Sequence, residues 1–322
     1  GFSAGFALMV LVALLIYRGY HIKKKANIAL REKNALISQQ KEEIQSQQDE
    51  IIHQRDKLAR QNQQITDSIN YAQRIQQAIL PTPDFLEENL PGHFILFLPR
   101  DIVSGDFYYV DRVGHYLIIA AADCTGHGVP GAFMSMMGVA FLNEIVHQPQ
   151  NQTAADMLDT LRSKVKKSLH QEDGRAMQGD GMDIALCAID TQKGLLHFAG
   201  AYNPLYLFRN GNLQQVKADR QPISSYFVER PFTNNEVQLQ PNDTLYIFSD
   251  GYADQLGGRA PKEKFKRSRL QKLLADVHTM PMAQQKEQLH ANIKNWQQHN
   301  PQVDDILLMG FRIPQKYFKH ES

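Results

Sequence analysis

Hydrophobic and polar residues follow three different patterns along the 322-residue chain. Residues 2–17 are uncharged and mostly aliphatic or aromatic, and Arg18 and the lysines at 23–25 follow them. Residues 26–68 contain no Pro or Gly and are rich in Gln, Lys and Glu. From His93 onward, short β-branched and aromatic runs alternate with longer amphipathic stretches. These patterns predict an apolar helix, a long polar helix and a domain that mixes strands with helices.

The apolar run predicts a transmembrane helix over residues 1–20. The run is slightly shorter than the ~20 residues that span a bilayer, but the chain begins with Gly, so we expect a piece of a longer protein. A signal peptide would carry its charges before the apolar run, and a core helix would not lead directly into a polar one. Because positive charge follows the run, the remainder of the chain is expected on the cytoplasmic side.

Residues 21–67 are expected to form a coiled-coil stalk. Leu and Ile recur at strict seven-residue spacing at Leu30, Ile37, Ile44, Ile51, Leu58 and Ile65. A sustained heptad predicts a left-handed coiled coil, and a parallel homodimer follows if both chains leave the same membrane. The other core positions of the heptad are Asn27, Asn34, Lys41, Gln48, Arg55, Asn62 and Ile69, so the seam is half polar. Polar residues at these positions lower stability but can fix register and a dimeric state. A solvated single helix is the alternative, and it leaves the sevenfold spacing unexplained.

Residues 68–81 continue the helical pattern as far as Pro81, where a helix must end. The apolar positions of this segment are Ile69, Ala72, Ile75, Ile79 and Leu80. Their helical spacing predicts one face that docks on the domain that follows. The segment is either an ordinary amphipathic linker or an element that transmits a signal to the domain.

The remaining residues predict an α+β domain, because strand-rich blocks are separated by paired helices. Expected strands cover residues 94–98, 107–110, 116–121, 183–190, 194–200, 204–209, 212–216, 244–249 and 305–312. Expected helices cover residues 130–147, 152–170, 262–276 and 282–297.

Composition narrows the function classes. The formal net charge of +1 gives no nucleic-acid footprint, and a hydrophobic share of 43% is enough for a packed core. The two cysteines, Cys124 and Cys187, are far apart in the chain and have neither disulfide nor zinc spacing. This usage is typical of a reducing cytosol.

Five short motifs place an Asp at the edge of an apolar run or beside Gly. They contain Asp106, Asp123, Asp183, Asp250 and Asp304. Carboxylates at strand ends can converge on one point, where they repel one another unless a cation neutralises them. Ligation by oxygen alone suits Mg²⁺ or Mn²⁺ rather than Zn²⁺. The motifs therefore predict a hard-cation site, binuclear in the manner of phosphate-ester hydrolases.

The ordered motifs SGD, ADCTGHGVPGA, GMDIALCAID, FAGAYNPLY, LYIFSDGYAD and VDDI carry a family resemblance. Over roughly residues 68–313 the chain resembles bacterial metal-dependent Ser/Thr protein phosphatases of the PPM class, SpoIIE/RsbU-like subfamily. The resemblance implies an αββα sandwich of two antiparallel sheets over residues 82–316, with a tail at 317–322. It also implies that residues 68–81 are a switch helix between stalk and domain.

The resemblance implies metal-binding roles residue by residue. Asp106, Asp123, Asp250 and Asp304 match the carboxylates that hold two Mn²⁺ or Mg²⁺ ions and take part in catalysis. Cys124 matches a position whose backbone carbonyl is a ligand. Asp254 matches an acidic position linked to a weaker third metal.

Three further residues have more than one reading. Arg100, six residues before Asp106, is a candidate phosphate clamp or a solvated edge residue. His127, between two glycines, is a candidate general acid or substrate-binding group, or a turn residue. Asp183 turns a loop or touches the site.

The expected function is that of a membrane-tethered phosphoserine/phosphothreonine phosphatase at the bacterial inner membrane, switched through its dimeric stalk by an upstream sensor. In the resembling family a common substrate is a phosphorylated anti-sigma-factor antagonist, so a phosphoprotein is the expected partner. One alternative is a non-catalytic signalling scaffold, which the presence of all four carboxylates disfavours. Another is a sensor kinase, but the only stalk histidine is His53 and no nucleotide-binding boxes follow it.

Overall fold

The structure is a computed structural model that describes residues 2–90, 92–148, 153–171, 179–258 and 263–318. It divides into two compact units, Gly1–Asp67 and Ser68–Ser322. Residues 319–322 of the predicted tail, and residues 152 and 262 at the starts of two predicted helices, lie outside the described residues.

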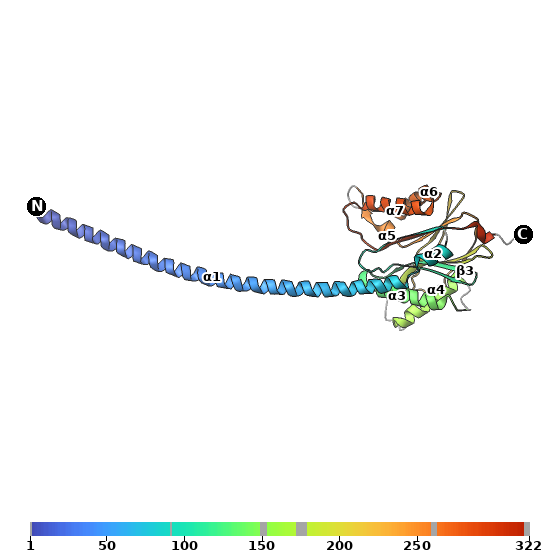
Figure 1. The fold of residues 1–322 in the computed structure, drawn as a ribbon, viewed down its shortest axis with the longest axis horizontal. Coiled ribbons are helices and arrows are strands. Elements are labelled where there is room, and N and C mark those ends of the chain that lie inside the picture. Colours follow the sequence, from blue (N-terminus) through green and yellow to red (C-terminus); the bar gives the residue numbers. More distant parts are fainter. Residues whose placement is uncertain (1, 91, 149–152, 172–178, 259–262, 319–322) are drawn as a thin grey trace. The chain divides into compact units, whose positions relative to one another are not determined.

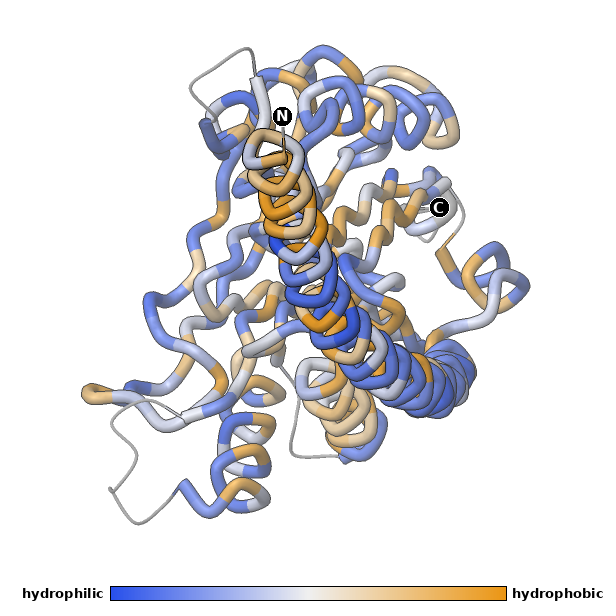
Figure 2. Tube along the Cα trace, turned by 90° about the vertical axis from the view of Figure 1, so that its left-hand side faces the viewer, coloured by the Kyte–Doolittle hydropathy of each residue, from blue (hydrophilic) through white to orange (hydrophobic). Residues whose placement is uncertain are grey.

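The first unit consists of helix α1, which covers Phe2–Ile79 and so continues into the second unit. Figure 2 shows its beginning as predominantly hydrophobic and the following turns as predominantly hydrophilic. Among the described residues, only the helix that begins at Phe2 is long and apolar enough to cross a membrane. That test rests on length and composition, and a signal sequence near an N-terminus passes it as well.

The second unit is built from two five-stranded antiparallel sheets and the helices that cover them (Figure 1). One sheet has the order β2-β3-β4-β5-β8 and the other β1-β12-β9-β6-β7. The strands of the first are β2 Phe107–Val113, β3 Tyr116–Cys124, β4 Met182–Asp190, β5 Leu195–Ala201 and β8 Asn235–Gln238. The strands of the second are β1 His93–Leu98, β6 Leu205–Arg209, β7 Asn212–Val216, β9 Thr244–Phe248 and β12 Ile306–Arg312.

Helices cover the outer face of each sheet. The helices of this unit beyond α1 are α2 Pro83–Asn89, α3 Gly128–Ile145, α4 Ala154–Ser168, α5 Gly251–Asp254, α6 Arg267–Val277 and α7 Met282–Gln297. The short pair β10 Leu256–Gly257 and β11 Glu263–Lys264, and the 3₁₀ helix Gln315–Phe318, complete the described elements. Helices α3 and α4 lie on one side of the paired sheets, and α6 and α7 lie on the other (Figure 1).

Alternation along the strands explains this layering, because successive side chains of a strand point to opposite faces. In β3, Ile118, Ala120 and Ala122 pack with α3 and α4. The intervening Leu117, Ile119 and Ala121 pack between the two sheets with residues of β9 and β12. The predicted architecture of two antiparallel sheets flanked by helices is confirmed.

Some predicted boundaries are wrong. Helix α6 begins at Arg267 rather than near residue 262, because Glu263 and Lys264 pair with β10 instead. Lys266 then takes a left-handed backbone with φ of 76°, which interrupts helical geometry immediately before Arg267.

Helix α2 and strand β8 are among the elements that the sequence did not predict. Helix α2 begins where the Thr82 hydroxyl accepts a hydrogen bond from the Phe85 N–H at 3.3 Å. Strand β8 is short and polar, and it is held by pairing with β5 rather than by a hydrophobic pattern of its own.

Candidate active site

The Asp-bearing motifs meet at one end of the two sheets. In the first sheet, β2 begins just after Asp106, β3 ends just after Asp123, and Phe107 pairs with Ala122. In the second sheet, β9 ends at Phe248 and β12 begins at Ile306, and Phe248 pairs with Leu308. Antiparallel pairing therefore brings motifs far apart in sequence to a common edge, as the sequence predicted.

A cavity of about 370 Å³ opens at this edge. Its lining includes the carboxylates of Asp123, Asp183, Asp250 and Asp304, together with Cys124, His127, Tyr202 and Tyr226. Asp106 is not part of the lining and is almost completely buried. The site is therefore an acidic pocket with one further carboxylate buried close by.

Burial and mutual repulsion raise the pKa of these carboxyl groups. Burial is the largest cause at Asp106 and Asp123, whose pKa values lie well above the usual range, and neighbouring carboxylates raise them further. The pKa of Asp250 is raised by burial and then by Asp254 and Asp304, while Arg267 lowers it. Burial also raises the pKa of Asp304. The pocket thus concentrates negative charge with little compensating positive charge.

Asp183 belongs to this group, although its motif alone gave it no secure role. It lies directly opposite Asp123 in the β3–β4 register, so the two side chains share one face of the sheet. Burial, followed by repulsion from Asp250, raises the pKa of Asp183 to about 7. Two like charges at directly opposed positions are destabilising, and a cation between them would relieve the repulsion.

The donor set fits a hard divalent cation by its chemistry. The converging side-chain donors are carboxylate oxygens, which Mg²⁺ and Mn²⁺ prefer. Burial raises the pKa of the Cys124 thiol well above its usual range, so a thiolate ligand is disfavoured at this residue. Within the described residues, no three His, Cys, Asp or Glu side chains already have metal-binding geometry. The Asp123 side chain does lie close enough to Asp250 to lower the pKa of that carboxyl.

Two glycines, Gly105 and Gly131, explain how the loops approach so closely. A Cβ on Gly105 would lie 2.5 Å from the carbonyl oxygen of Gly126, and a Cβ on Gly131 would clash with the same oxygen. Since both obstacles are backbone atoms, they cannot move aside as a flexible side chain would. Gly105 of SGD and Gly131 of VPGA are therefore required by their close approach to the Gly126 carbonyl. A Cβ on Gly126 itself would meet nothing within 4 Å, and its φ of 85° favours glycine instead.

Two residues beside the predicted ligands orient the site, and neither was predicted. The Ser249 hydroxyl donates to Oδ2 of Asp106 at 2.5 Å, and the Leu307 N–H donates to the same hydroxyl at 3.0 Å. The buried Asp305 carboxylate accepts from the backbone N–H of Arg100 at 2.7 Å. Both residues stand inside motifs that the sequence singled out, so their motif membership was the available signal.

The other predicted site residues, His127, Arg100 and Asp254, lie at or near the pocket. His127 lines the pocket, and its Nδ1 is 2.9 Å from Oδ2 of Asp101. The Arg100 guanidinium donates to the Val303 carbonyl at 2.9 Å and is not part of the pocket lining. The carboxylate of Asp254 is 2.6 Å from Nζ of Lys264 and also lies outside the lining, although its charge raises the pKa of Asp250.

The end of α1 contacts the site through a buried glutamine. Nε2 of Gln76 donates to the Ser104 carbonyl at 2.6 Å and to the Ser135 hydroxyl at 2.8 Å. The Ser104 N–H donates back to Oε1 of Gln76 at 3.1 Å. Ile75, which the pattern placed on the docked face, is 43% exposed instead. Gln76 lies four residues after Ala72 and three before Ile79, so helical spacing could have identified it.

Known proteins share this fold. Residues 113–314 match the family described as Stage II sporulation protein E (SpoIIE). The search of curated proteins finds no match. The SiaA-PP2C domain of Pseudomonas aeruginosa is 34% identical, with a TM-score of 0.71 over 78% of this chain and 98% of that chain.

Two more distant structures share the fold. The PP2C phosphatase domain of SpoIIE from Bacillus subtilis, with a fragment of its regulatory domain, is 18% identical with a TM-score of 0.56, over 69% of this chain and 63% of that one. The RsbU and RsbW domains of a Mycobacterium tuberculosis protein are 18% identical with a TM-score of 0.52, over 69% and 60%. With the family match and the SiaA similarity, these findings show that the chain belongs to the SpoIIE family and carries a PP2C-type phosphatase domain.

Proposed function

We propose that this chain is a membrane-tethered, metal-dependent phosphoserine/phosphothreonine protein phosphatase whose activity is set through a dimeric coiled coil by an upstream sensor. One observation carries the catalytic part of the proposal. Carboxylates from separate motifs meet at one pocket of a PP2C-type domain, and their mutual repulsion calls for a cation. The domain's family depends on Mg²⁺ or Mn²⁺.

The metal ligands in this proposal are Asp106, Asp123, Asp250 and Asp304, together with the backbone carbonyl of Cys124. Asp254 serves a weaker third site, since its charge already acts on Asp250. When bound, two divalent cations would supply a water of lowered pKa and positive charge for the phosphoryl oxygens.

The other roles belong to residues of the chain itself. Ser249 holds the Asp106 carboxylate in one orientation through its hydroxyl. His127, whose Nδ1 lies against Asp101, has its second ring nitrogen available to hold or donate a proton at the pocket. Arg100, beside the DD motif, contributes positive charge at the rim, where it already lowers the pKa of Asp304. We assign His127 and Arg100 to the substrate side on these grounds.

The stalk proposal is supported by surface that a single chain leaves uncovered. Leu30, Ile37, Ile44, Ile51, Leu58 and Ile65 are each 55–62% exposed. Exposed Leu and Ile residues that recur on one side of an otherwise polar helix indicate a partner, and the sevenfold spacing fits a second copy of the same helix. A parallel dimer on a membrane would keep both phosphatase domains on the cytoplasmic side of a bacterial inner membrane.

Regulation through the stalk requires a physical link to the pocket. Within the second unit, that link is Gln76, which joins the last turn of α1 to the backbone of Ser104, two residues before Asp106. A rotation or shift of this turn would move the loop that carries Asp106. The substrate in this proposal is a phosphoprotein, of which a phosphorylated anti-sigma-factor antagonist is one example.

The proposal is tested by hydrolysis of a phosphoserine peptide and p-nitrophenyl phosphate by fragments 68–322 and 26–322. Each is assayed with Mn²⁺, Mg²⁺ or EDTA, beside Asp250→Asn, with Mn²⁺ binding measured calorimetrically in parallel. We expect metal-dependent turnover that Asp250→Asn lowers by roughly two orders of magnitude or more, since metal catalysis is worth several kcal/mol.

A difference between the two fragments would support control by the stalk. Absence of turnover from folded protein that binds Mn²⁺ would contradict the enzymatic proposal and favour a signalling scaffold.

A further inference from the structure

The segment 219–233, called here the rim loop, forms one wall of the acidic pocket. It has little regular structure, with bridges only at Asp219 and Ile223. Pro222, Ser224 and Tyr226 of this loop line the cavity. A long irregular segment beside a candidate site is either a loosely held connection or a constructed surface, and its contacts distinguish the two.

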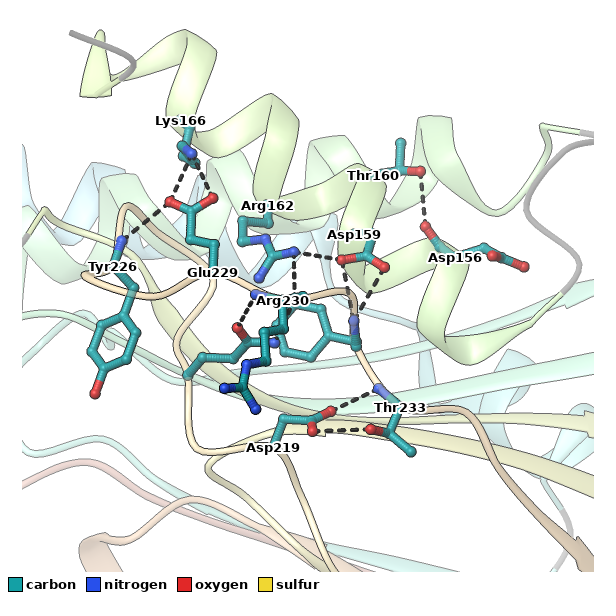
Figure 3. A network of polar contacts seen from close by, with 12 residues as sticks. Asp156, Asp159, Thr160, Arg162, Lys166, Asp219, Tyr226, Glu229, Arg230 and Thr233 are labelled. Carbon is teal, nitrogen blue, oxygen red and sulfur yellow. Dashed lines mark hydrogen bonds and ion pairs between the residues drawn. The ribbon is translucent and has the colours of Figure 1, made fainter. Parts of the chain in front are cut away.

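Polar contacts fasten the rim loop to helix α4 (Figure 3). Arg162 donates to Asp159 at 2.6 Å and to the Arg230 carbonyl at 2.9 Å. The Lys166 ammonium contacts both Glu229 carboxylate oxygens at 2.7 Å. The Asp159 carboxylate also accepts from the Phe232 N–H. We call these contacts between α4 and the rim loop the latch. Arg162 is nearly buried, so its part of the latch is shielded from solvent.

Further hydrogen bonds close the base of the loop. Gln221 accepts from the Arg230 N–H at 3.0 Å and donates to the Arg230 carbonyl at 2.8 Å. Asp219 accepts from both the backbone and the hydroxyl of Thr233. The two pairs, Gln221–Arg230 and Asp219–Thr233, bring the ends of the loop together. Residues 222–229, which these pairs enclose, are therefore held as one unit.

The tip of this fixed unit is apolar and faces solvent. Phe227 is 72% exposed and Val228 is 61% exposed. The preceding Tyr226 is joined to Tyr202, whose hydroxyl donates to the Tyr226 hydroxyl at 3.1 Å. Tyr202 has a left-handed backbone with φ of 55°, which is uncommon for a bulky residue and is typical of functional sites. An exposed apolar pair is thus held next to the pocket by a strained neighbour and a buried latch.

We propose that Phe227 and Val228 dock an apolar side chain of the phosphoprotein substrate, beside the phosphorylated Ser or Thr. This inference rests on the proposed phosphatase function and names what the enzyme reads outside the phosphoryl group. The occupant follows from continuity with the pocket, because Tyr226 lines the pocket and Phe227 is the next residue in the chain.

The position of the apolar residue follows from chain geometry. An extended substrate advances about 3.3–3.6 Å per residue, so three residues on either side of the phosphorylated one reach about 10 Å from it. The pocket itself is lined largely by polar and charged groups, which suit the phosphoryl end of a substrate. In this proposal, Phe227 and Val228 at the exposed tip therefore distinguish one phosphoprotein from another.

The experiment uses the full chain in detergent micelles with Mn²⁺. The probes are phosphoserine peptides on a Gln background, with a single Leu placed at each position from three before to three after the phosphoserine, and p-nitrophenyl phosphate. The variant is Phe227→Ser with Val228→Ser. The matched control is Phe133→Ser, since Phe133 is 66% exposed on α3 and does not line the pocket.

We expect the wild-type chain to favour at least one Leu peptide over the all-Gln peptide by about tenfold in kcat/KM. The double variant should lose this preference and keep its p-nitrophenyl phosphate activity, and Phe133→Ser should keep both. A preference that survives in the double variant, or a wild-type chain that turns over every peptide equally, would overturn the docking surface while leaving the phosphatase intact.

Two other results would also overturn the inference, for different reasons. If the double variant loses dimerisation but not peptide preference, the tip is an interface between copies of this chain. If no probe is hydrolysed, including p-nitrophenyl phosphate, the phosphatase function itself fails and the docking surface fails with it.

Discussion

Asp305 accepts a hydrogen bond from the backbone N–H of Gly105 at 2.7 Å, although 200 positions separate the two residues in sequence. The same carboxylate accepts from the Arg100 N–H. One buried side chain of the DD motif therefore shapes the loop that presents Asp106. Its neighbour Asp304 points to the pocket instead. Two adjacent Asp residues thus have separate roles, and substitution can tell them apart.

Asp305→Asn should lower the free energy of unfolding by about 1–3 kcal/mol, because one buried N–H loses a charged acceptor. Mn²⁺ affinity should fall by about 10–100-fold, as for residues that orient a ligand loop. Asp304→Asn, the matched variant, should lower activity further with little loss of stability. Chemical denaturation and calorimetric Mn²⁺ titration measure these effects. Equal stability losses in both variants would show that the two carboxylates are not divided in this way.

The raised carboxyl pKa values predict how stability of the metal-free protein depends on pH. The pKa of Asp183 is about 7 in the folded chain against an ordinary value of 3.8. Between these values the folded state binds more protons than the unfolded state, so the free energy of unfolding falls as pH rises. Asp183→Asn should remove part of this decline and stabilise the metal-free protein at pH 7.5 by an amount on the order of 1–4 kcal/mol.

Mn²⁺ should reverse the decline, because a bound cation replaces the protons and stabilises the folded state. Thermal denaturation in EDTA and in Mn²⁺, at pH 5.5 and pH 7.5, measures both effects. The Mn²⁺-induced rise in Tm should be larger at pH 7.5. A Mn²⁺-induced rise in Tm that is larger at pH 5.5 would contradict the proposed repulsion among the pocket carboxylates. So would a metal-free protein that becomes more stable between pH 5.5 and pH 7.5 because of Asp183.

Gln76→Ala should disturb the site from the end of α1. The backbone of Ser104 is completely buried, so removal of its side-chain partner should cost about 1–3 kcal/mol of stability. Mn²⁺-dependent activity should fall as well, because Ser104 lies two residues before Asp106. Gln77→Ala is the matched control, since Gln77 is exposed and should change stability by less than about 0.5 kcal/mol. Loss of stability with unchanged Mn²⁺ affinity and kcat would mark Gln76 as purely structural.

The heptad predicts that two neighbouring residues, Leu36 and Ile37, differ in their contribution to dimerisation. Ile37 belongs to the seam and Leu36 does not, although their exposures in the single chain are similar. Ile37→Gln should weaken dimerisation of fragment 26–322 at least about tenfold, because each dimer loses two buried Ile side chains. Leu36→Gln should leave dimerisation unchanged. Sedimentation equilibrium measures both, and a monomeric wild-type fragment would refute the coiled coil.

Much of the fold was predictable because its signals are local. The continuous apolar run at 116–121 predicted β3, and Asp residues at the edges of such runs or beside Gly marked strand ends that meet at one pocket. The predicted start of α6 was wrong because Glu263 and Lys264 pair with β10, and helical propensity does not indicate such a contact. Strand β8 was missed because its pairing with β5, rather than its own composition, holds it in place.

The sequence by itself determined the order of the motifs, the periodicity of the long helix, the α+β class and the acidic character of the site. These follow from backbone geometry and side-chain chemistry that act over a few residues. Only the tertiary structure decided that Asp305 holds Gly105, that Gln76 holds Ser104, that Asp183 faces Asp123, and that the rim loop presents Phe227 beside the pocket. Each of these contacts joins segments far apart in the chain. Strand register and packing determine such contacts, and a local sequence pattern indicates neither register nor packing.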